Sequence, residues 1–318
     1  MIEANGAELC TEHFGDSEDP AILLVMGLGA SMLWWDEGFC RMLAEGGRLV
    51  IRYDHRDTGC SVTYEPGRPG YTGADLVTDA VGVLDAYGLP AANVVGVSAG
   101  GAFAQLLALD FRERVRSLVL ISTSPATPGD RTLPAPTREF TRFVTTTEVD
   151  WSDAASVIEY LVEYMRVLAG PERPFDEPVA RAFVRRDVER ARDFAAAQNH
   201  NAIEQADSNQ PLSSIGVPTL VLHGTADPLF PLEHGQALAD DIPGARLLAL
   251  SGAGHGVDRA DWEIVARAIL EHTAASMEGE RSRRSHTPTR MSASSAASAN
   301  VGPGAGCHPG TSGLSSVE

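Results

Sequence analysis

Short apolar runs alternate with amphipathic stretches along most of this chain. The unbroken apolar run Ala21–Met26 predicts a buried strand, and similar runs predict strands at 49–53, 93–97, 115–121, 219–222 and 246–250. Apolar residues at i, i+3 and i+4 predict helices at 36–44, 76–87, 102–109 and 264–272. Because strands alternate with helices, the pattern predicts an α/β fold, with a mostly parallel twisted sheet covered by helices on both faces.

One long stretch interrupts this alternation. Between Pro125 and Pro211 the sequence shows helical patterns and no convincing strand, over a length far beyond an ordinary connection. We therefore expect a helical cap at 125–211, inserted into an α/β core formed by 1–124 and 212–275.

The composition changes after Ala275. Ser, Ala, Gly, Pro and Thr dominate the remaining residues, and large apolar side chains are almost absent. Such a segment buries too little surface to offset the entropy lost on ordering. The sequence therefore predicts a disordered tail at 276–318.

The string Gly96-Val-Ser98-Ala-Gly100 lies between a predicted strand and a predicted helix rich in small residues. This strand–turn–helix context is what a nucleophile elbow requires, because the tight turn lifts a serine hydroxyl above the sheet edge. A glycine-rich turn with an incidental serine is the alternative reading. We interpret Ser98 as a nucleophile.

A serine nucleophile needs a general base, and the base needs a carboxylate that orients it. Asp227 directly follows the predicted strand 219–222, and His255 lies between glycines after the predicted strand 246–250. This places the three residues in the order Ser, acid, His, which is the order of α/β-hydrolases. The sequence thus predicts a triad of Ser98, Asp227 and His255.

The tetrahedral intermediate of acyl transfer also needs hydrogen-bond donors for its oxyanion. We expect these from the backbone N–H of Ala99, which follows the nucleophile, and of Leu28, in the glycine-containing loop after the first core strand. Trp34, Trp35 and Phe230 are candidates for lining the substrate pocket, although core packing explains the tryptophans equally well.

The polar loop Asp54–Ser61 follows the predicted strand 49–53. A loop of this kind at the catalytic edge could contact the substrate. We favour a structural network in which Arg56 and its acidic neighbours fix the adjacent loops.

Composition excludes several classes of function. The net charge of −18 disfavours binding to nucleic acid or to an anionic membrane surface. The chain has no lysine, which excludes Schiff-base chemistry and a phosphate-binding P-loop lysine. Its cysteines are far apart, with no C-x-x-C pair, which suggests reduced thiols and no zinc site. We expect no cofactor and no metal, and a small-molecule ester as the binding partner.

The N-terminus has neither a basic region nor an apolar run of the signal-peptide type. No apolar stretch approaches the length needed to span a bilayer. We therefore expect a cytoplasmic protein.

With these residues in place, residues 1–274 resemble an α/β-hydrolase, and more narrowly the group of anthracycline methylesterases and of macrolide esterases from antibiotic-resistance cassettes. The strings that carry this resemblance are 24–29, 53–59, 95–101, 222–228 and 252–256, and Ile2–Leu9 with Ser31–Trp35 is especially similar to the cassette esterases. The resemblance implies hydrolysis of the lactone of sixteen-membered macrolides in a roomy pocket under the cap. The chain departs from many relatives at Cys60, where they have Arg, and at Met26, where His is commoner.

Other functions remain open on the same fold. An anthracycline-type methylesterase or a general carboxylesterase would use the same triad, and a cofactor-free perhydrolase would also use it. A non-catalytic ligand sensor would have no need for Asp227 and His255. Haloalkane dehalogenases and epoxide hydrolases are disfavoured, because they need a carboxylate where Ser98 stands.

Overall fold

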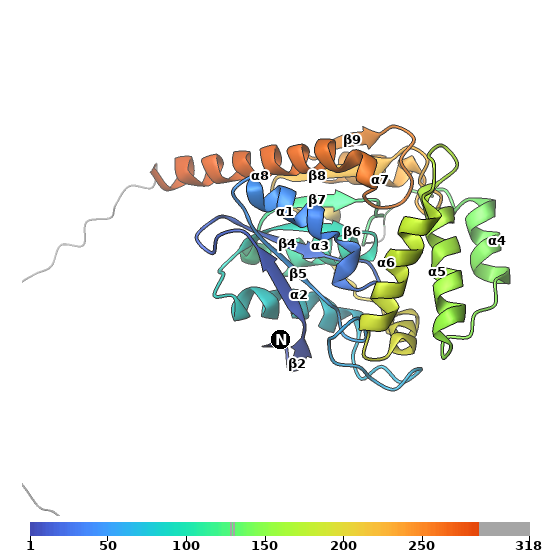
Figure 1. Ribbon diagram of the computed structural model, residues 1–318. Helices are drawn as coiled ribbons and strands as arrows, with labels where there is room; N and C mark the ends of the chain where they lie inside the picture. The colour runs from blue at the N-terminus through green and yellow to red at the C-terminus, as the bar shows by residue number, and fades with distance from the viewer. Residues whose placement is uncertain (128, 130, 286–318) are drawn as a thin grey trace, which may run out of the picture.

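The computed structural model describes residues 1–127, 129 and 131–285 (Figure 1). At its centre lies a seven-stranded sheet in the order β3-β5-β4-β6-β7-β8-β9. The strands are β3 (Thr11–Phe14), β4 (Ala21–Val25), β5 (Leu49–Tyr53), β6 (Ala92–Val97), β7 (Val115–Ile121), β8 (Thr219–Gly224) and β9 (Arg246–Leu250). All neighbouring strands pair in parallel except β3, which runs antiparallel to β5 at the edge. The predicted fold class is confirmed.

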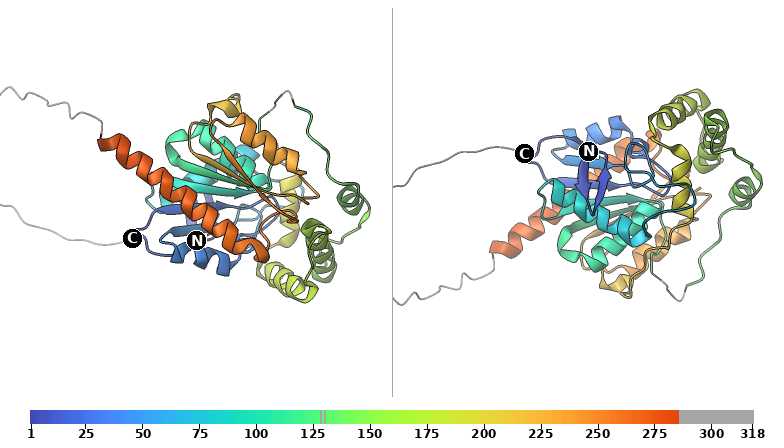
Figure 2. Two further views of the ribbon diagram at one scale, coloured as in Figure 1. Left: turned by 90° about the horizontal axis from the view of Figure 1, so that it is seen from above. Right: turned by 90° about the horizontal axis from the view of Figure 1, so that it is seen from below.

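Helices cover both faces of the sheet, as Figures 1 and 2 show. One face packs against α1 (Glu37–Glu45) and α8 (Trp262–Ser285), and the other against α2 (Gly73–Ala86), α3 (Ala99–Asp110) and α7 (Leu232–Asp241). Strand β4 contributes to both cores, because Ile22 and Leu24 point to one face while Leu23 and Val25 point to the other. A strand buried on both sides has to be apolar throughout, which explains the unbroken run in the sequence.

The chain between β7 and β8 forms a separate helical layer, hereafter the cap. It contains α4 (Arg138–Thr146), α5 (Ala154–Ala169), α6 (Glu177–Arg190) and the 3₁₀ segment η3 (Phe194–Asn201). No strand occurs among the described residues of this stretch. The cap helices stand beside the carboxyl ends of the parallel strands, at the right in Figure 1. Their own small apolar core consists of Val157, Leu161, Val162 and Val184.

Two features differ from the sequence-based expectations. Helix α8 continues to Ser285, so residues 276–285, which composition assigned to a disordered tail, are helical. The remainder of that predicted tail, 286–318, lies outside the described residues. The sequence patterns also missed strand β3, helix α7 and a small N-terminal hairpin of β1 (Ile2–Ala4) and β2 (Ala7–Leu9).

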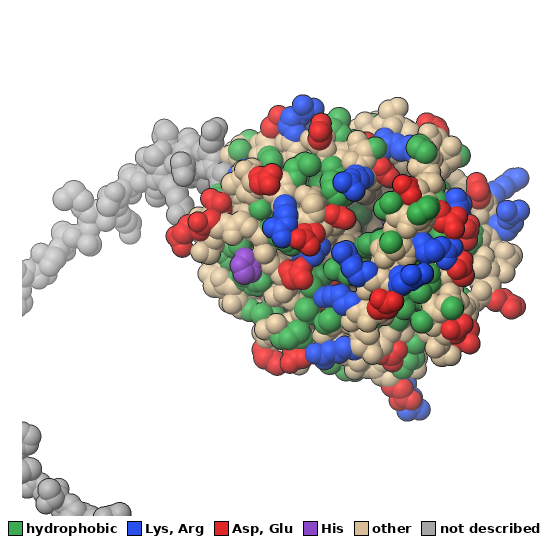
Figure 3. All heavy atoms as spheres, in the orientation of Figure 1, with side chains coloured by type: hydrophobic (Ala, Val, Ile, Leu, Met, Phe, Trp, Pro, Cys, Tyr) green, Lys and Arg blue, Asp and Glu red, His purple; other side chains and the backbone are tan. Residues whose placement is uncertain are grey.

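Short 3₁₀ turns complete the described structure at η1 (Met32–Trp34), η2 (Arg112–Arg114), η4 (Leu212–Ser214) and η5 (Arg259–Asp261). None of the helices that the structure describes is both long and apolar enough to cross a membrane. Acidic and basic side chains are interspersed over the face shown in Figure 3. Arg41 and Glu37 in α1 form one of the ion pairs between side chains of opposite charge.

Candidate active site

Ser98 occupies the turn between β6 and α3 in a backbone conformation that side chains rarely adopt, with φ 56° and ψ −127°. The strand and the helix approach so closely that a Cβ at Gly96 would lie 2.2 Å from the Gly100 carbonyl oxygen. A Cβ at Gly100 would lie 2.2 Å from the carbonyl oxygen of Val25 in the neighbouring strand. The glycines of the G-x-S-x-G string are therefore required by the turn itself. Among the described residues, the Ser98 hydroxyl has no hydrogen-bond partner.

The carboxylate of Asp227 lies just beyond β8 and is almost completely buried. Its Oδ2 is 2.9 Å from His255 Nδ1, and its Oδ1 accepts hydrogen bonds of 2.9 Å from the backbone N–H groups of Leu229 and Phe230. Burial alone would raise the pKa of Asp227, but the charge and hydrogen bond of His255 and the N–H of Phe230 outweigh it and hold that pKa below its usual value. Asp227 is therefore an ionised group in contact with the imidazole of His255.

The loop that carries His255 is fixed from two sides. The backbone N–H of His255 donates a 2.8 Å hydrogen bond to the carbonyl of Leu168 at the end of α5, in the cap. The N–H of Gly256 donates to the hydroxyl of Ser122, which follows β7 with a φ of 45°. The imidazole is thus held at the same sheet edge as Ser98 by groups from the core and from the cap.

The two expected oxyanion donors have free N–H groups. Neither the Leu28 amide nor the Ala99 amide donates a hydrogen bond elsewhere within the described part of the chain. Ala99 is the first residue of α3, where the helix dipole favours negative charge. In contrast, the N–H of Gly29 is already occupied, because it donates to Nδ1 of His200 at 2.7 Å. Of these three amides, those of Leu28 and Ala99 thus remain unengaged within the described residues.

A cavity of about 930 Å³ lies between the sheet edge and the cap, and both Ser98 and His255 line it. Most of its wall is apolar, and aromatic side chains from the cap contribute a large share. These aromatic residues are Trp151, Tyr160, Tyr164, Phe175, Phe183 and Phe194. Several of them pack on one another, with Trp151 and Tyr160 edge to face at a centroid distance of 5.3 Å.

The three residues predicted to line the substrate pocket occupy different environments in the structure. Trp34 lines the cavity, and its indole N–H donates to Asp187 at 2.9 Å, which fixes the ring. Trp35 also touches the cavity but is only 2 % exposed and stacks on Phe39 in the core. Phe230 is not among the residues that line the cavity. Its ring lies 5.7 Å from the His255 ring, so it contacts that imidazole and not the cavity.

The polar loop after β5 forms a buried network, as favoured from the sequence. Arg56 pairs with both carboxylate oxygens of Asp79 at 2.8 Å, and Asp54 accepts the N–H of Met32 at 2.8 Å. The hydroxyl of Tyr71 donates to Asp57 at 2.6 Å. These contacts tie the loop to α2 and to the loop after β4, so it supports the site and does not line the cavity near Ser98.

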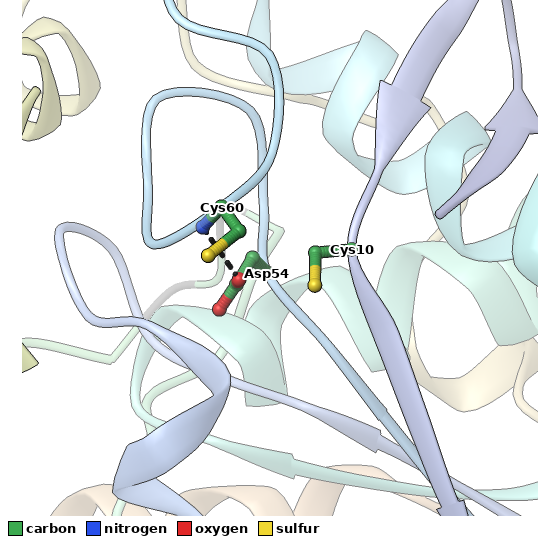
Figure 4. A group of neighbouring side chains, drawn as sticks. All are labelled: Cys10, Asp54 and Cys60. Carbon is green, nitrogen blue, oxygen red and sulfur yellow. Dashed lines mark hydrogen bonds between the residues drawn. The ribbon is translucent and has the colours of Figure 1, made fainter. Parts of the chain in front are cut away.

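One group of side chains has the composition of a metal site. Cys10, Asp54 and Cys60 place their ligand atoms within 4.8 Å of one another. Figure 4 shows these three side chains. However, the guanidinium of Arg190 lies 2.8 Å from Asp54 and 3.5 Å from the Cys10 sulfur. Because this cation already balances the buried carboxylate, we assign no metal to the cluster.

Three further histidines, which the sequence analysis does not single out, lie around the site. His55 and His223 follow or end strands β5 and β8, a position that could have drawn attention to them. His223 Nε2 lies 2.7 Å from the Phe230 carbonyl oxygen and 3.7 Å from Asp227 Oδ2, so it packs against the loop that carries Asp227. His200 lies in the cap, where no motif marks it.

Comparison with known proteins agrees with this fold. The family model described as "alpha/beta hydrolase fold" matches residues 20–257. A rhodomycin D methylesterase from a Streptomyces species is 34% identical to this chain, covering 86% of it and 98% of the relative. A second rhodomycin D methylesterase, from Streptomyces peucetius, is 33% identical, with the same coverage of both chains.

Solved structures share the architecture. An enol-lactonase from Burkholderia xenovorans superposes with a TM-score of 0.67 at 26% identity, covering 86% of this chain and 99% of its own. A meta-cleavage product hydrolase from Pseudomonas fluorescens gives a TM-score of 0.70 at 21% identity, covering 86% and 97%. The latter likeness shows the fold alone.

The fold and these similarities define an ester hydrolase by class. The chain belongs to the alpha/beta hydrolase fold family, and the expected resemblance to anthracycline methylesterases is confirmed.

Proposed function

We propose that this chain is a serine esterase in which Ser98 is the nucleophile, His255 the general base and Asp227 the orienting acid. The observation that carries the proposal is the 2.9 Å contact between Asp227 Oδ2 and His255 Nδ1, at the edge of a cavity that Ser98 and His255 both line. All three residues follow parallel strands at their carboxyl ends, which is where sites form in sheets of this kind.

The geometry gives each residue a defined step. Because His255 Nδ1–H donates to Asp227, the lone pair of Nε2 is free to take the proton of Ser98 as its oxygen attacks the ester carbonyl. The N–H groups of Leu28 and Ala99 then hold the oxyanion. Protonated Nε2 passes its proton to the departing alkoxide, which leaves an acyl-enzyme. A water molecule deprotonated by the same nitrogen releases the acid and regenerates Ser98.

For the substrate, we propose the lactone of a sixteen-membered macrolide, so that the reaction inactivates an antibiotic. The cavity of about 930 Å³ is near the upper end of the range of about 300–1,000 Å³ for small-molecule sites. Ser31–Trp35 is part of the resemblance to resistance-cassette esterases, and Leu33, Trp34 and Trp35 from this segment line the cavity.

The charges around the cavity also suit such a substrate. The ionised side chains of its lining are the three carboxylates Asp36, Asp176 and Asp258 and the single guanidinium of Arg259. This excess of negative charge favours a ligand with a protonated amino sugar, although salt screens much of the long-range attraction.

A second candidate is the methyl ester of an anthracycline. It is favoured by the two relatives named as rhodomycin D methylesterases, each of which matches 86% of this chain. The aromatic wall of the cap would also suit a flat polycyclic ring system.

One experiment separates the two candidates. The purified full chain is incubated with a panel of macrolides and with an anthracycline methyl ester, and the products are analysed by mass spectrometry. Opening a lactone adds the mass of one water to the macrolide, whereas demethylation removes the mass of one methylene group from the anthracycline. A macrolide that stays intact beside a demethylated anthracycline would favour the second candidate.

The matched control is Ser98→Ala. This variant should bind substrates but form no product, and a fluorophosphonate probe should not label it. Hydrolysis of p-nitrophenyl butyrate serves as the general esterase assay. Hydrolysis at the wild-type rate by Ser98→Ala would contradict the proposed mechanism for every substrate.

A further inference from the structure

The loop that follows β4 is held by histidines on both sides of the Leu28 amide. Before Leu28, the carbonyl oxygen of Met26 lies 2.9 Å from His55 Nε2. After Leu28, the N–H of Gly29 donates to His200 Nδ1 at 2.7 Å. Gly29 has a φ of +73°, so this turn of the loop uses a conformation that favours glycine. The two contacts together fix the peptide planes next to the Leu28 N–H.

The hydrogen bonds of His200 define its tautomer. Nδ1 accepts from Gly29 and must therefore carry a lone pair, so the proton resides on Nε2, which lies 2.8 Å from the carbonyl oxygen of Arg56. Burial, followed by the neighbouring charge of His55, lowers the pKa of His200 to about 3. The imidazole thus stays neutral near pH 7, with both nitrogens engaged.

The surroundings of His200 keep its ring in place. The side chain is almost completely buried. Its ring meets the rings of His55 and Tyr71 edge to face, at centroid distances of 6.1 Å and 6.2 Å. Although His200 lines the cavity, it has no spare nitrogen for a substrate, because both are bonded to backbone groups.

We propose that His200 is a positioning residue for the oxyanion hole: by accepting the Gly29 N–H, it aims the Leu28 N–H at the carbonyl that Ser98 attacks. His200 belongs to the cap, so the cap completes the catalytic geometry in addition to enclosing the substrate. This inference rests on the proposed esterase mechanism, in which Leu28 supplies an oxyanion donor.

Two substitutions at position 200 each remove one of the two hydrogen bonds of the His200 imidazole. In His200→Asn, the side-chain carbonyl replaces Nδ1 and keeps an acceptor for Gly29, but the donor to Arg56 is lost. In His200→Gln, the longer amide places its N–H near the former Nε2 and keeps the donor to Arg56, but the acceptor for Gly29 is lost. The pair thus changes one contact at a time at the same position.

We expect His200→Gln to lower kcat for p-nitrophenyl butyrate on the order of a hundredfold, because misplacing a catalytic group by about 1 Å has an effect of this size. The KM should change by less than about threefold, since the donor acts in the transition state. His200→Asn should retain kcat within about fivefold of wild type. A boronic acid, which forms a tetrahedral adduct on Ser98, should lose affinity for His200→Gln by a similar factor and bind His200→Asn nearly normally.

A buried histidine outside the cavity provides the control. His272 lies on α8, is only 4 % exposed and does not line the cavity. His272→Gln tests the loss of a buried imidazole by itself, and it should leave kcat and boronic acid affinity unchanged even if the melting temperature falls.

Two results would overturn the proposal: wild-type kcat in His200→Gln, or equal losses in His200→Asn and His200→Gln. The second result would mean that ring packing matters and the acceptor does not. Failure of the underlying mechanism has a different signature, because Ser98→Ala would then still hydrolyse the ester.

Discussion

Replacing the carboxylate of Asp227 by an amide tests the triad with almost no change in shape. In Asp227→Asn, the amide oxygen has to take the position of Oδ1, because two backbone N–H groups, from Leu229 and Phe230, donate to that atom at 2.9 Å. The NH₂ group then takes the position of Oδ2, which is 2.9 Å from His255 Nδ1. A donor at this place forces the proton of His255 onto Nε2, the atom that must accept the Ser98 proton.

The expected loss follows from this wrong tautomer. We expect kcat to fall about 10⁴-fold, as in other triads with this substitution, which corresponds to about 5 kcal/mol of transition-state stabilisation. The KM should change little, and the stability should change by less than about 2 kcal/mol, because every hydrogen-bonding position at residue 227 keeps a partner.

The assay is steady-state hydrolysis of p-nitrophenyl butyrate by wild type and Asp227→Asn at equal concentrations of folded protein. Asp75→Asn is the control, because Asp75 also accepts a backbone N–H, from Thr72 at 2.8 Å, but lies at the start of α2 away from the cavity. If Asp227→Asn kept kcat within about tenfold of wild type, Asp227 could not be the acid of a triad.

Three further predictions follow from other contacts. Gly27→Ala should lower kcat/KM on the order of a hundredfold, with the fold intact by circular dichroism. The reason is that the new Cβ would lie 3.2 Å from Ser98 Cβ, where the substrate carbonyl must approach. An unchanged kcat/KM would mean that the carbonyl binds elsewhere. The pKa of His200 is about 3 in the folded protein, below its ordinary value of about 6.5. As the pH drops, the imidazole is therefore protonated first in the unfolded chain, and the stability of the fold decreases between about pH 6.5 and pH 3. His200→Asn should reduce that slope by about 1.4 kcal/mol per pH unit in urea titrations near pH 5, and equal slopes would contradict a neutral buried imidazole. Arg56→Met should destabilise the fold by about 3–5 kcal/mol, because Asp79, whose side chain is 0 % exposed, would lose its cationic partner and keep only the hydrogen bond from Asn5. A loss below about 1 kcal/mol in urea denaturation would refute this.

The core of the fold was accessible to sequence reasoning wherever burial imposes a strong pattern. The central strands are covered on both faces, so Leu49–Tyr53 and Val115–Ile121 appear in the structure with the predicted bounds. Strand β3 is different, because it lies at the sheet edge and its residues Thr11–Phe14 are only partly buried or exposed. An edge strand has one free side and no need for an apolar run.

Local sequence likewise indicates some residues of the candidate site and not others. Ser98, Asp227 and His255 were predicted because their loops carry glycines and follow strands, features that local sequence displays. The contacts of His200 and the position of Phe230 could not be predicted in this way, because they depend on segments far apart in the sequence. The bond from Gly29 to His200, for instance, joins positions 171 residues apart, and no local pattern reports such a contact.

The carbonyl of Leu168 and the ring of His200 also bear on protein engineering. The insertion begins after β7 and ends before β8, which invites exchange of whole caps between relatives to change what the enzyme accepts. Yet Leu168 holds the backbone of His255, and His200 holds the backbone of Gly29. A chimera with a foreign cap would need equivalents of both contacts, or it would gain a new pocket and lose turnover at the same time.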